Sequence, residues 1–338
     1  MFTSDLDFTY PPELIALEPS RPSRIAFIAA GEPEELTMPD LLSRFAPGDL
    51  LVVNESKVIP ARVFSLEEVE VLFLNSIDES HWQVLFPSRD LKIGDQLNMP
   101  DGLTLTLVTK GLPQVVEVSR PLNEGYLQNF GEVALPPYIQ EARGERHNRP
   151  ADRNWYQTAW ARTSGSVAAP TASLHFRQTH LDLLRENGVG VQHVTLHVGA
   201  GTFLPVKTSE LSQHTMHAEL ASVPQATLAA IDATKARGGR VWALGTTVAR
   251  TLESQANGML HQQDDGSFSG PTKLFIYPPY EFKVVDALLT NFHQPKSTLF
   301  GLVAAFATLE KTKNVYAWAI ERRFQLFSYG DLSAWIKP

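Results

Sequence analysis

The hydrophobic positions divide the chain into regions with different periods. From residue 63 to about residue 118, short apolar segments alternate with Asp, Ser, Gly and Pro and show no helical period; the clearest of them are 69–73, 82–86 and 103–107. Short apolar runs at near-regular spacing are typical of small antiparallel barrels or sandwiches. We therefore expect a small antiparallel β-module here.

The rest of the chain alternates between strand and helix patterns. Strands are predicted at 50–53, 191–198, 241–244 and 274–276, and helices at 181–187, 224–237 and after Ser297, which is placed as an N-cap. Such alternation is typical of the α/β class. The predicted fold is a mixed α/β body formed by residues 1–62 and 150–338, with a small antiparallel β-barrel domain inserted at 63–149.

Composition narrows the class of protein further. The 338 residues are 43% hydrophobic and 20% charged, which is ordinary for a globular protein with a large core. There is no cysteine, so thiolate chemistry is excluded. We find no apolar run of about 18 residues and no export signal, because Asp5 and Asp7 stand where such a signal carries Lys or Arg. A cytoplasmic protein without a membrane span is expected.

The net charge of -8 argues against a general nucleic-acid coat, since non-specific affinity comes from many Lys and Arg contacts to phosphates. It leaves room for a local basic face. The densest basic stretch runs from Arg143 to Arg153 among Gly, Asn and Pro, and is predicted to be an exposed loop. This stretch is either a solvated linker or a contact for phosphates.

Histidines near a glycine turn are the first candidates for chemistry. His193, Thr195 and His197 share one face of a predicted strand that runs into Gly199 and Gly201, where a ligand can approach the backbone. A tight turn with packed histidines is the competing interpretation. His217 followed by Glu219 suits proton transfer. A metal site built from His193, His197, His214 and His217 is the alternative, although the usual short zinc signatures are absent.

Two further polar segments follow predicted strands. Gly245-Thr246-Thr247 opens a helix that carries Arg250 and Glu253, a placement suited to a polar ligand at a helix N-terminus. A second polar segment lies between two apolar stretches and contains Asp286, Asn291, His293, Ser297 and Thr298. Both segments either line a pocket or consist of caps and surface pairs.

Taken together, these segments resemble the S-adenosylmethionine:tRNA ribosyltransferase-isomerase family of the queuosine pathway, over almost the whole chain. The matching motifs are Asp49-Leu-Leu-Val-Val-Asn54, Val58-Ile-Pro-Ala-Arg62, Leu135-Pro-Pro-Tyr-Ile139, Val167-Ala-Ala-Pro-Thr-Ala172 with Leu174-His-Phe176, Val194-Thr-Leu-His-Val-Gly-Ala-Gly-Thr-Phe203, Gly245-Thr-Thr247, Val284-Val-Asp-Ala-Leu-Leu-Thr-Asn-Phe-His293 and Phe327-Ser-Tyr-Gly-Asp331.

The resemblance implies an activity. Enzymes of this family transfer and isomerise the ribosyl moiety of S-adenosylmethionine onto 7-aminomethyl-7-deazaguanine at the wobble position of tRNA, and release adenine and methionine. S-adenosylmethionine and the modified tRNA are then the partners, with no cofactor and no metal. A monomer or loose dimer is expected, and the family fold of an α/β domain with an inserted small barrel agrees with the periodicity.

The resemblance and the patterns together give a set of candidate residues. The catalytic candidates are His197, His217 and Glu219. The candidates for substrate binding are Arg62, Thr171, His175, Gly199, Gly201, Thr202, Thr246, Thr247, Arg250, Glu253, Asp286, Asn291 and His293. The candidates for tRNA contact are Lys57, Arg143, Arg146 and Arg149.

The chain departs from the family pattern in several places. The glycine- and lysine-containing hairpin that usually follows the Pro-Ala-Arg motif is missing, and Val248 stands where a Ser is usual. Two alternatives therefore stay open: a paralogue with a different acceptor, and an RNA-binding relative without turnover. A metal-dependent hydrolase is a more remote third.

Overall fold

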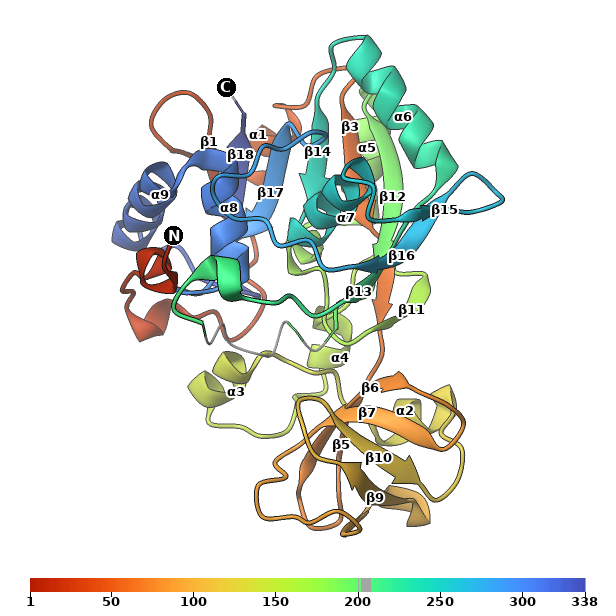
Figure 1. Cartoon of the computed structure of the whole chain (residues 1–338). Coiled ribbons are helices and arrows are strands. Elements are labelled where there is room, and N and C mark those ends of the chain that lie inside the picture. The colour runs from red at the N-terminus through yellow and green to blue at the C-terminus, as the bar shows by residue number, and fades with distance from the viewer. Residues whose placement is uncertain (200, 202–207, 338) are drawn as a thin grey trace.

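The computed structural model describes residues 1–199, 201 and 208–337. It is a mixed α/β structure in which a ten-stranded mixed sheet and a six-stranded antiparallel sheet occupy the two ends of the molecule (Figure 1). A short parallel pair, β4 (Ser56–Val58) with β11 (Thr163–Ser166), makes a third sheet. The predicted α/β class is confirmed.

The ten-stranded sheet forms the larger part. Its strands, in spatial order, are β15 (His261–Gln262), β16 (Phe268–Thr272), β13 (Glu219–Val223), β12 (Gly190–Leu196), β3 (Leu50–Asn54), β14 (Val241–Leu244), β17 (Ala287–Asn291), β18 (Leu332–Ile336), β1 (Ile25–Ile28) and β2 (Glu34–Leu36). The neighbours β12, β3, β14 and β17 run parallel, whereas β17 pairs antiparallel with β18. The carboxyl ends of the four parallel strands therefore lie at one edge.

Buried apolar runs explain why these strands occupy the centre. Every residue of β3, β14 and β17 is buried, as expected for parallel strands covered on both faces. Alternate residues supply two separate cores, so that Leu50 and Val52 pack into one cluster and Leu51 and Val53 into the other.

Helices cover both faces of this sheet. The helices of the structure are α1 (Met38–Leu42), α2 (Glu124–Phe130), α3 (Pro137–Arg143), α4 (Asp152–Trp155), α5 (Gln178–Glu186), α6 (Gln225–Ala236), α7 (Thr246–Ala256), α8 (Thr298–Ala307) and α9 (Leu309–Glu321). Leu181 and Leu184 of α5 belong to one core cluster, while α6, α7, α8 and α9 contribute to the other. Among the described residues, no helix is long and apolar enough to cross a membrane.

The six-stranded sheet contains the short segments that the periodicity predicted. Its order is β5 (Arg62–Phe64), β6 (Glu70–Ser76), β7 (His81–Leu85), β10 (Gln114–Val118), β9 (Thr104–Thr109) and β8 (Gln96–Asn98), with every pairing antiparallel. It encloses its own apolar cluster, which includes Phe73 and Leu105. The antiparallel prediction for this region is confirmed.

Most predicted elements of the body are present, and one prediction is wrong. Ser297 caps α8 by accepting a hydrogen bond from the backbone N–H of Phe300 at 3.1 Å. Residues 274–276 are not a strand, because β16 ends at Thr272 and the segment beyond it belongs to no sheet. Leu274 and Ile276 are buried against the helices instead, which accounts for the apolar pattern.

Candidate active site

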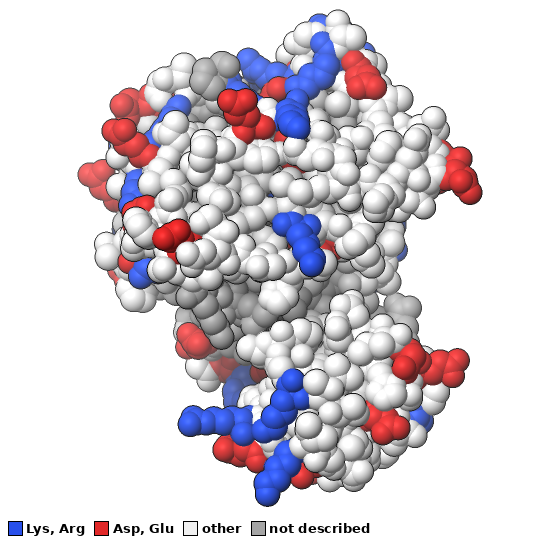
Figure 2. Space-filling view, in the orientation of Figure 1, with Lys and Arg blue, Asp and Glu red and all other residues white. Residues whose placement is uncertain are grey.

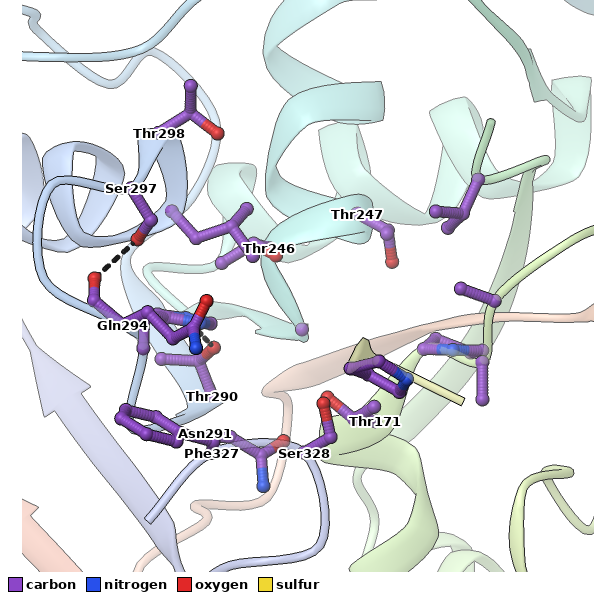
Figure 3. A pocket seen from close by; sticks show the side chains of 18 of the residues that line it. Thr171, Thr246, Thr247, Thr290, Asn291, Gln294, Ser297, Thr298, Phe327 and Ser328 are labelled. Atoms are coloured by element: carbon purple, nitrogen blue, oxygen red, sulfur yellow. Dashed lines mark hydrogen bonds between the residues drawn. The ribbon is translucent and has the colours of Figure 1, made fainter. Parts of the chain in front are cut away.

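A cavity of about 530 Å³ opens at the carboxyl edge of the parallel strands. Val198 beyond β12, Gly245 beyond β14 and Asn291 at the end of β17 all line it. The carboxyl ends of parallel strands are the usual place for ligands in such sheets, and the volume suits a small molecule. Figure 3 shows Thr246 and Thr247 of α7, Thr290 and Asn291 of β17, and Phe327 and Ser328 around this cavity.

A buried ion pair forms one part of the cavity wall. Oε2 of Glu219 lies 2.5 Å from Nη1 of Arg250, and Oε1 accepts a hydrogen bond from the backbone N–H of Gly199 at 3.0 Å. The two side chains are 4% and 8% exposed. Because a buried charge needs a partner, each of these groups supplies the opposite charge that the other requires. Nε and Nη2 of Arg250 are buried and have no hydrogen-bond partner in the described part of the chain.

Of the three predicted catalytic residues, His217 and Glu219 line the cavity, and His197 does not. His197 follows Leu196 and precedes Val198, which faces the cavity, so strand alternation turns its ring to the other side. There the ring lies against Gly165, where a Cβ atom would come within 3.1 Å of it. Burial lowers the pKa of His197.

His217 is the imidazole that faces the cavity near the ion pair. It is half-buried and makes no hydrogen bond with another described residue. It lies beside Gly201, where an added Cβ atom would be 3.4 Å from the Cβ of His217. His214 lies outside the cavity lining, with its ring 5.4 Å from that of Phe275. An unpartnered imidazole in a cavity is free to exchange a proton with a ligand.

A hydrogen-bond relay orients Asn291. Its Nδ2 donates to the carbonyl of Gly330 at 3.2 Å and to Nε2 of His175 at 3.1 Å. His175 therefore carries its proton on Nδ1, which donates to Oγ of Ser23 at 2.6 Å, and Ser23 donates onward to the carbonyl of Ser20. This fixes the orientation of the amide, and its buried Oδ1 has no hydrogen-bond partner among the described residues. His175 lies outside the cavity lining and positions a residue within it.

The structure places the remaining predicted substrate-binding residues in different surroundings. Five of them line the cavity: Thr171, Gly201, Thr246, Thr247 and His293. Gly199 is not in the lining, but its backbone N–H donates to Glu219, which is. Thr202 lies outside the described residues. Burial lowers the pKa of His293 to about 3, so its ring is neutral, and Nε2 lies 2.9 Å from Oγ1 of Thr290.

Arg62, Glu253 and Asp286 are not brought to the cavity. Arg62 is 1% exposed and pairs with Glu132 at 2.6 Å. Glu253 is fully buried and accepts hydrogen bonds from the segment that leads into β17. Asp286 precedes β17, at the opposite edge of the sheet from the cavity, and pairs with Lys235 at 2.5 Å.

The predicted tRNA-contact residues differ in how free they are. The side chain of Arg143 is 1% exposed and forms an ion pair with Asp152 at 2.6 Å. Arg149 pairs with Glu145 at 2.9 Å, and Arg146 donates to the carbonyl of Glu68. Lys57 on β4 is half-buried and forms no ion pair with a described residue. On the face seen in Figure 2, charges of both signs lie around the periphery. The narrower region between the part with the ten-stranded sheet and the part with the six-stranded sheet carries few of them.

Within the described ranges, no group of three or more His, Asp or Glu side chains is arranged to hold a metal ion. The four histidines of the metal alternative do not converge, because His197 faces Gly165 and His193 lies 3.7 Å from Glu55. Burial lowers the pKa of His193, which opposes its protonation despite the nearby carboxylate.

Several cavity residues were not among the candidates. Among them are Tyr138, Thr290, Gln294, Phe327 and Ser328, whereas Ser297 and Thr298 line the cavity as one of the two interpretations of their segment predicted. The family motifs could have identified three of them, because the Pro-Pro-Tyr and Phe-Ser-Tyr-Gly-Asp motifs contain Tyr138, Phe327 and Ser328. In the structure, the hydroxyl of Tyr138 lies 2.5 Å from Oγ of Ser328, and burial raises the pKa of Tyr138 to about 12.

A mixed α/β sheet with a ligand-sized cavity at its parallel strand ends, walled by these motifs, places the chain in a defined class. The chain belongs to the queuosine biosynthesis protein family, whose profile matches residues 3–334.

Individual relatives carry a more specific name. The chain is 44% identical over 349 residues to the S-adenosylmethionine:tRNA ribosyltransferase-isomerase of Citrifermentans bemidjiense, with 98% of each chain covered. It is 41% identical to the protein of that name from a Ruegeria species, covering 98% of this chain and 99% of the relative. A crystal structure of S-adenosylmethionine tRNA ribosyltransferase from Thermotoga maritima at 2.00 Å superposes with a TM-score of 0.56 at 32% identity, covering 98% of this chain and 100% of that one.

Proposed function

We propose that this protein transfers and isomerises the ribosyl moiety of S-adenosylmethionine onto 7-aminomethyl-7-deazaguanine at the wobble position of tRNA, giving epoxyqueuosine-tRNA. Adenine and methionine leave. S-adenosylmethionine is a substrate, and the reaction uses no metal or other cofactor. The relatives' shared name supports this proposal, since it states both the ribosyl transfer and the isomerisation.

One structural observation carries the proposal: a single cavity brings together His217, the Glu219–Arg250 pair and the N-terminus of α7. The chemistry needs each kind of group. The sulfonium of the donor acidifies the adjoining ribose carbon, so a base must remove a proton there, while the aminomethyl group of the acceptor acts as the nucleophile. Adenine requires protonation to leave.

The surroundings of the two cavity candidates suit them to different tasks. Glu219 already accepts hydrogen bonds from Arg250 and from the backbone of Gly199, so both of its carboxylate oxygens are held in place. Such a fixed carboxylate stabilises the positive charge of a sulfonium. His217 has no described partner, and we propose that it moves the proton.

Product release tests the activity directly. Purified protein is incubated with S-adenosylmethionine and with tRNA that carries either 7-aminomethyl-7-deazaguanine or guanine at the wobble position, and free adenine and methionine are quantified. Equal release of both products with the modified tRNA alone is the expected result. Adenine release with the guanine-bearing tRNA, or none with the modified one, contradicts the proposal.

The role of His217 is tested by its replacement. His217→Asn should lower the turnover number by about 10²- to 10⁴-fold, the usual contribution of a positioned acid or base, and should leave the melting temperature nearly unchanged. His214→Asn is the matched control, because His214 lies three positions away and outside the lining. Wild-type turnover in His217→Asn assigns the proton transfer to another group.

Further properties complete the proposal. We propose that residues 63–149, with the six-stranded sheet, form an inserted barrel-like domain on a body made of residues 1–62 and 150–338. This arrangement leaves the region between the two sheets for the anticodon stem-loop, with Lys57, Arg146 and Arg149 as candidate contacts. The side chain of Arg143 is buried in its pair with Asp152 and is not available to RNA. We also propose a cytoplasmic location, where tRNA is found, and a monomer or loose dimer as the working form.

A further inference from the structure

The α7 helix begins at the cavity wall without a cap. Its N-cap position is Gly245, with φ of 99°, and no side chain of the described ranges caps the helix. The backbone N–H groups of Thr246, Thr247 and Val248 have no acceptor among the described residues. Such groups carry partial positive charge and favour an anion. A second feature lies beside this helix terminus.

That second feature is the free edge of Arg250. On a helix, side chains lean toward the N-terminus, so a residue three positions after Thr247 extends over the first turn. Nη1 of Arg250 is used by Glu219. Nε and Nη2, whose hydrogens point side by side, are buried and have no partner among the described residues. A residue that is 6% exposed rarely leaves two such donors unused.

We propose that the Nε/Nη2 edge of Arg250 and the first turn of α7 hold the carboxylate of the methionine moiety of the donor. This inference rests on the proposed function, because it names the part of S-adenosylmethionine that this corner of the cavity receives. A carboxylate is planar and accepts two parallel hydrogen bonds from a guanidinium edge.

The other charged groups of the lining favour this assignment. Lys296 is the other Lys or Arg among the described lining residues, and it pairs with Asp7 at 2.7 Å. Arg250 is therefore the buried cation of the lining, and it keeps two donors that no described residue uses. A phosphate inside an RNA strand is flanked by two sugars, for which a side chain that is only 8% exposed leaves little room. A small anion at the end of a molecule fits better.

The experiment removes the carboxylate from the ligand in one arm and the Nε/Nη2 edge of Arg250 from the protein in the other. The values of kcat/KM for adenine release are measured with S-adenosylmethionine and with decarboxylated S-adenosylmethionine, on tRNA carrying the modified base. The proteins compared are wild type and Arg250→Lys. Lysine keeps a positive charge opposite Glu219 but has no guanidinium edge.

Wild type should prefer the intact donor by about 10- to 100-fold, the value of a bidentate charge-assisted contact. Arg250→Lys should reduce this preference to within about threefold of unity, through loss of activity on the intact donor alone. Arg143→Lys is the matched control: it makes the same change at a buried arginine whose nitrogens all have partners. It should lower the melting temperature and keep the preference.

Three results overturn the inference. The first is equal use of both donors by wild type, and the second is an unchanged preference in Arg250→Lys. The third is a raised KM for tRNA in Arg250→Lys with the preference intact, which assigns the Nε/Nη2 edge of Arg250 to a phosphate. If a variant is inactive, calorimetric titration of both nucleosides in the presence of guanine-bearing tRNA measures the same preference. Absence of adenine release by wild type counts against the proposed function, while the titration still decides the carboxylate contact.

Discussion

Glu253 offers the sharpest test of how a motif residue outside the cavity contributes. Its carboxylate is fully buried, and Oε1 accepts hydrogen bonds from the backbone N–H groups of Val284 at 2.9 Å and Val285 at 3.1 Å. Oε2 accepts from the hydroxyl of Tyr280 and the backbone N–H of Lys283, both at 2.9 Å. Glu253 thus ties α7 to the segment that leads into β17. We expect its replacement to affect stability before activity.

The size of the effect follows from these four contacts. In Glu253→Gln, the amide nitrogen must replace one oxygen and then faces two donors. Two charge-assisted hydrogen bonds are lost, and a buried group left unsatisfied costs about 1–3 kcal/mol. The free energy of unfolding should therefore fall by about 3–5 kcal/mol. With about 2.1 cal/mol/K of unfolding entropy per residue, this lowers the melting temperature by roughly 4–7 °C.

Calorimetric melting and steady-state kinetics at 20 °C together show whether Glu253 contributes to stability or to ligand binding. Glu281→Gln, an exposed carboxylate in the same segment, is the control and should change stability by less than about 0.5 kcal/mol. The KM for S-adenosylmethionine should remain at the wild-type value in both variants. A Glu253→Gln protein that melts normally but no longer binds the donor refutes the reasoning and makes Glu253 a ligand-binding residue.

Three other predictions concern protonation, metals and RNA. Since burial lowers the pKa of His293 to about 3, the unfolded chain takes up a proton first as the pH falls below about 6.5, and stability is lost from there down to about pH 3. Between pH 7 and pH 5, urea unfolding should show a pH-dependent loss about 2 kcal/mol smaller in His293→Asn than in wild type; parallel curves argue against a buried neutral ring. Dialysis against a chelator should leave adenine release unchanged, whereas a loss that zinc restores revives the hydrolase alternative. Lys57→Ala should weaken tRNA binding and reduce the slope of log affinity against log salt by about one, because Lys57 forms no ion pair with a described residue; Arg149→Ala, whose charge is held by Glu145, should change the slope less.

The arrangement of strands and helices was largely predictable, because period and burial agree over most of the body. The failure at 274–276 has a simple origin. Leu274 and Ile276 are apolar because they pack against helices, and alternation of apolar residues does not reveal whether a neighbouring strand is present to complete the ladder.

The candidate site was predictable in kind but less so residue by residue. The sequence placed His193, Thr195 and His197 on one face of a strand, yet it held no information on which face meets the cavity; Val198 does, and His197 does not. Arg62 and Glu253 look like ligand-binding residues in a motif because buried charges need exact partners within the protein too. Only the fold separates these two reasons for a polar residue.

A crystal structure with S-adenosylmethionine bound tests the central claim most directly, namely that the donor occupies the cavity at the carboxyl edge of β12, β14 and β17. The account predicts density for the nucleoside between the first turn of α7 and Asn291, with His217 facing the ribose. Density for the donor elsewhere on the protein, with this cavity holding only solvent, contradicts it.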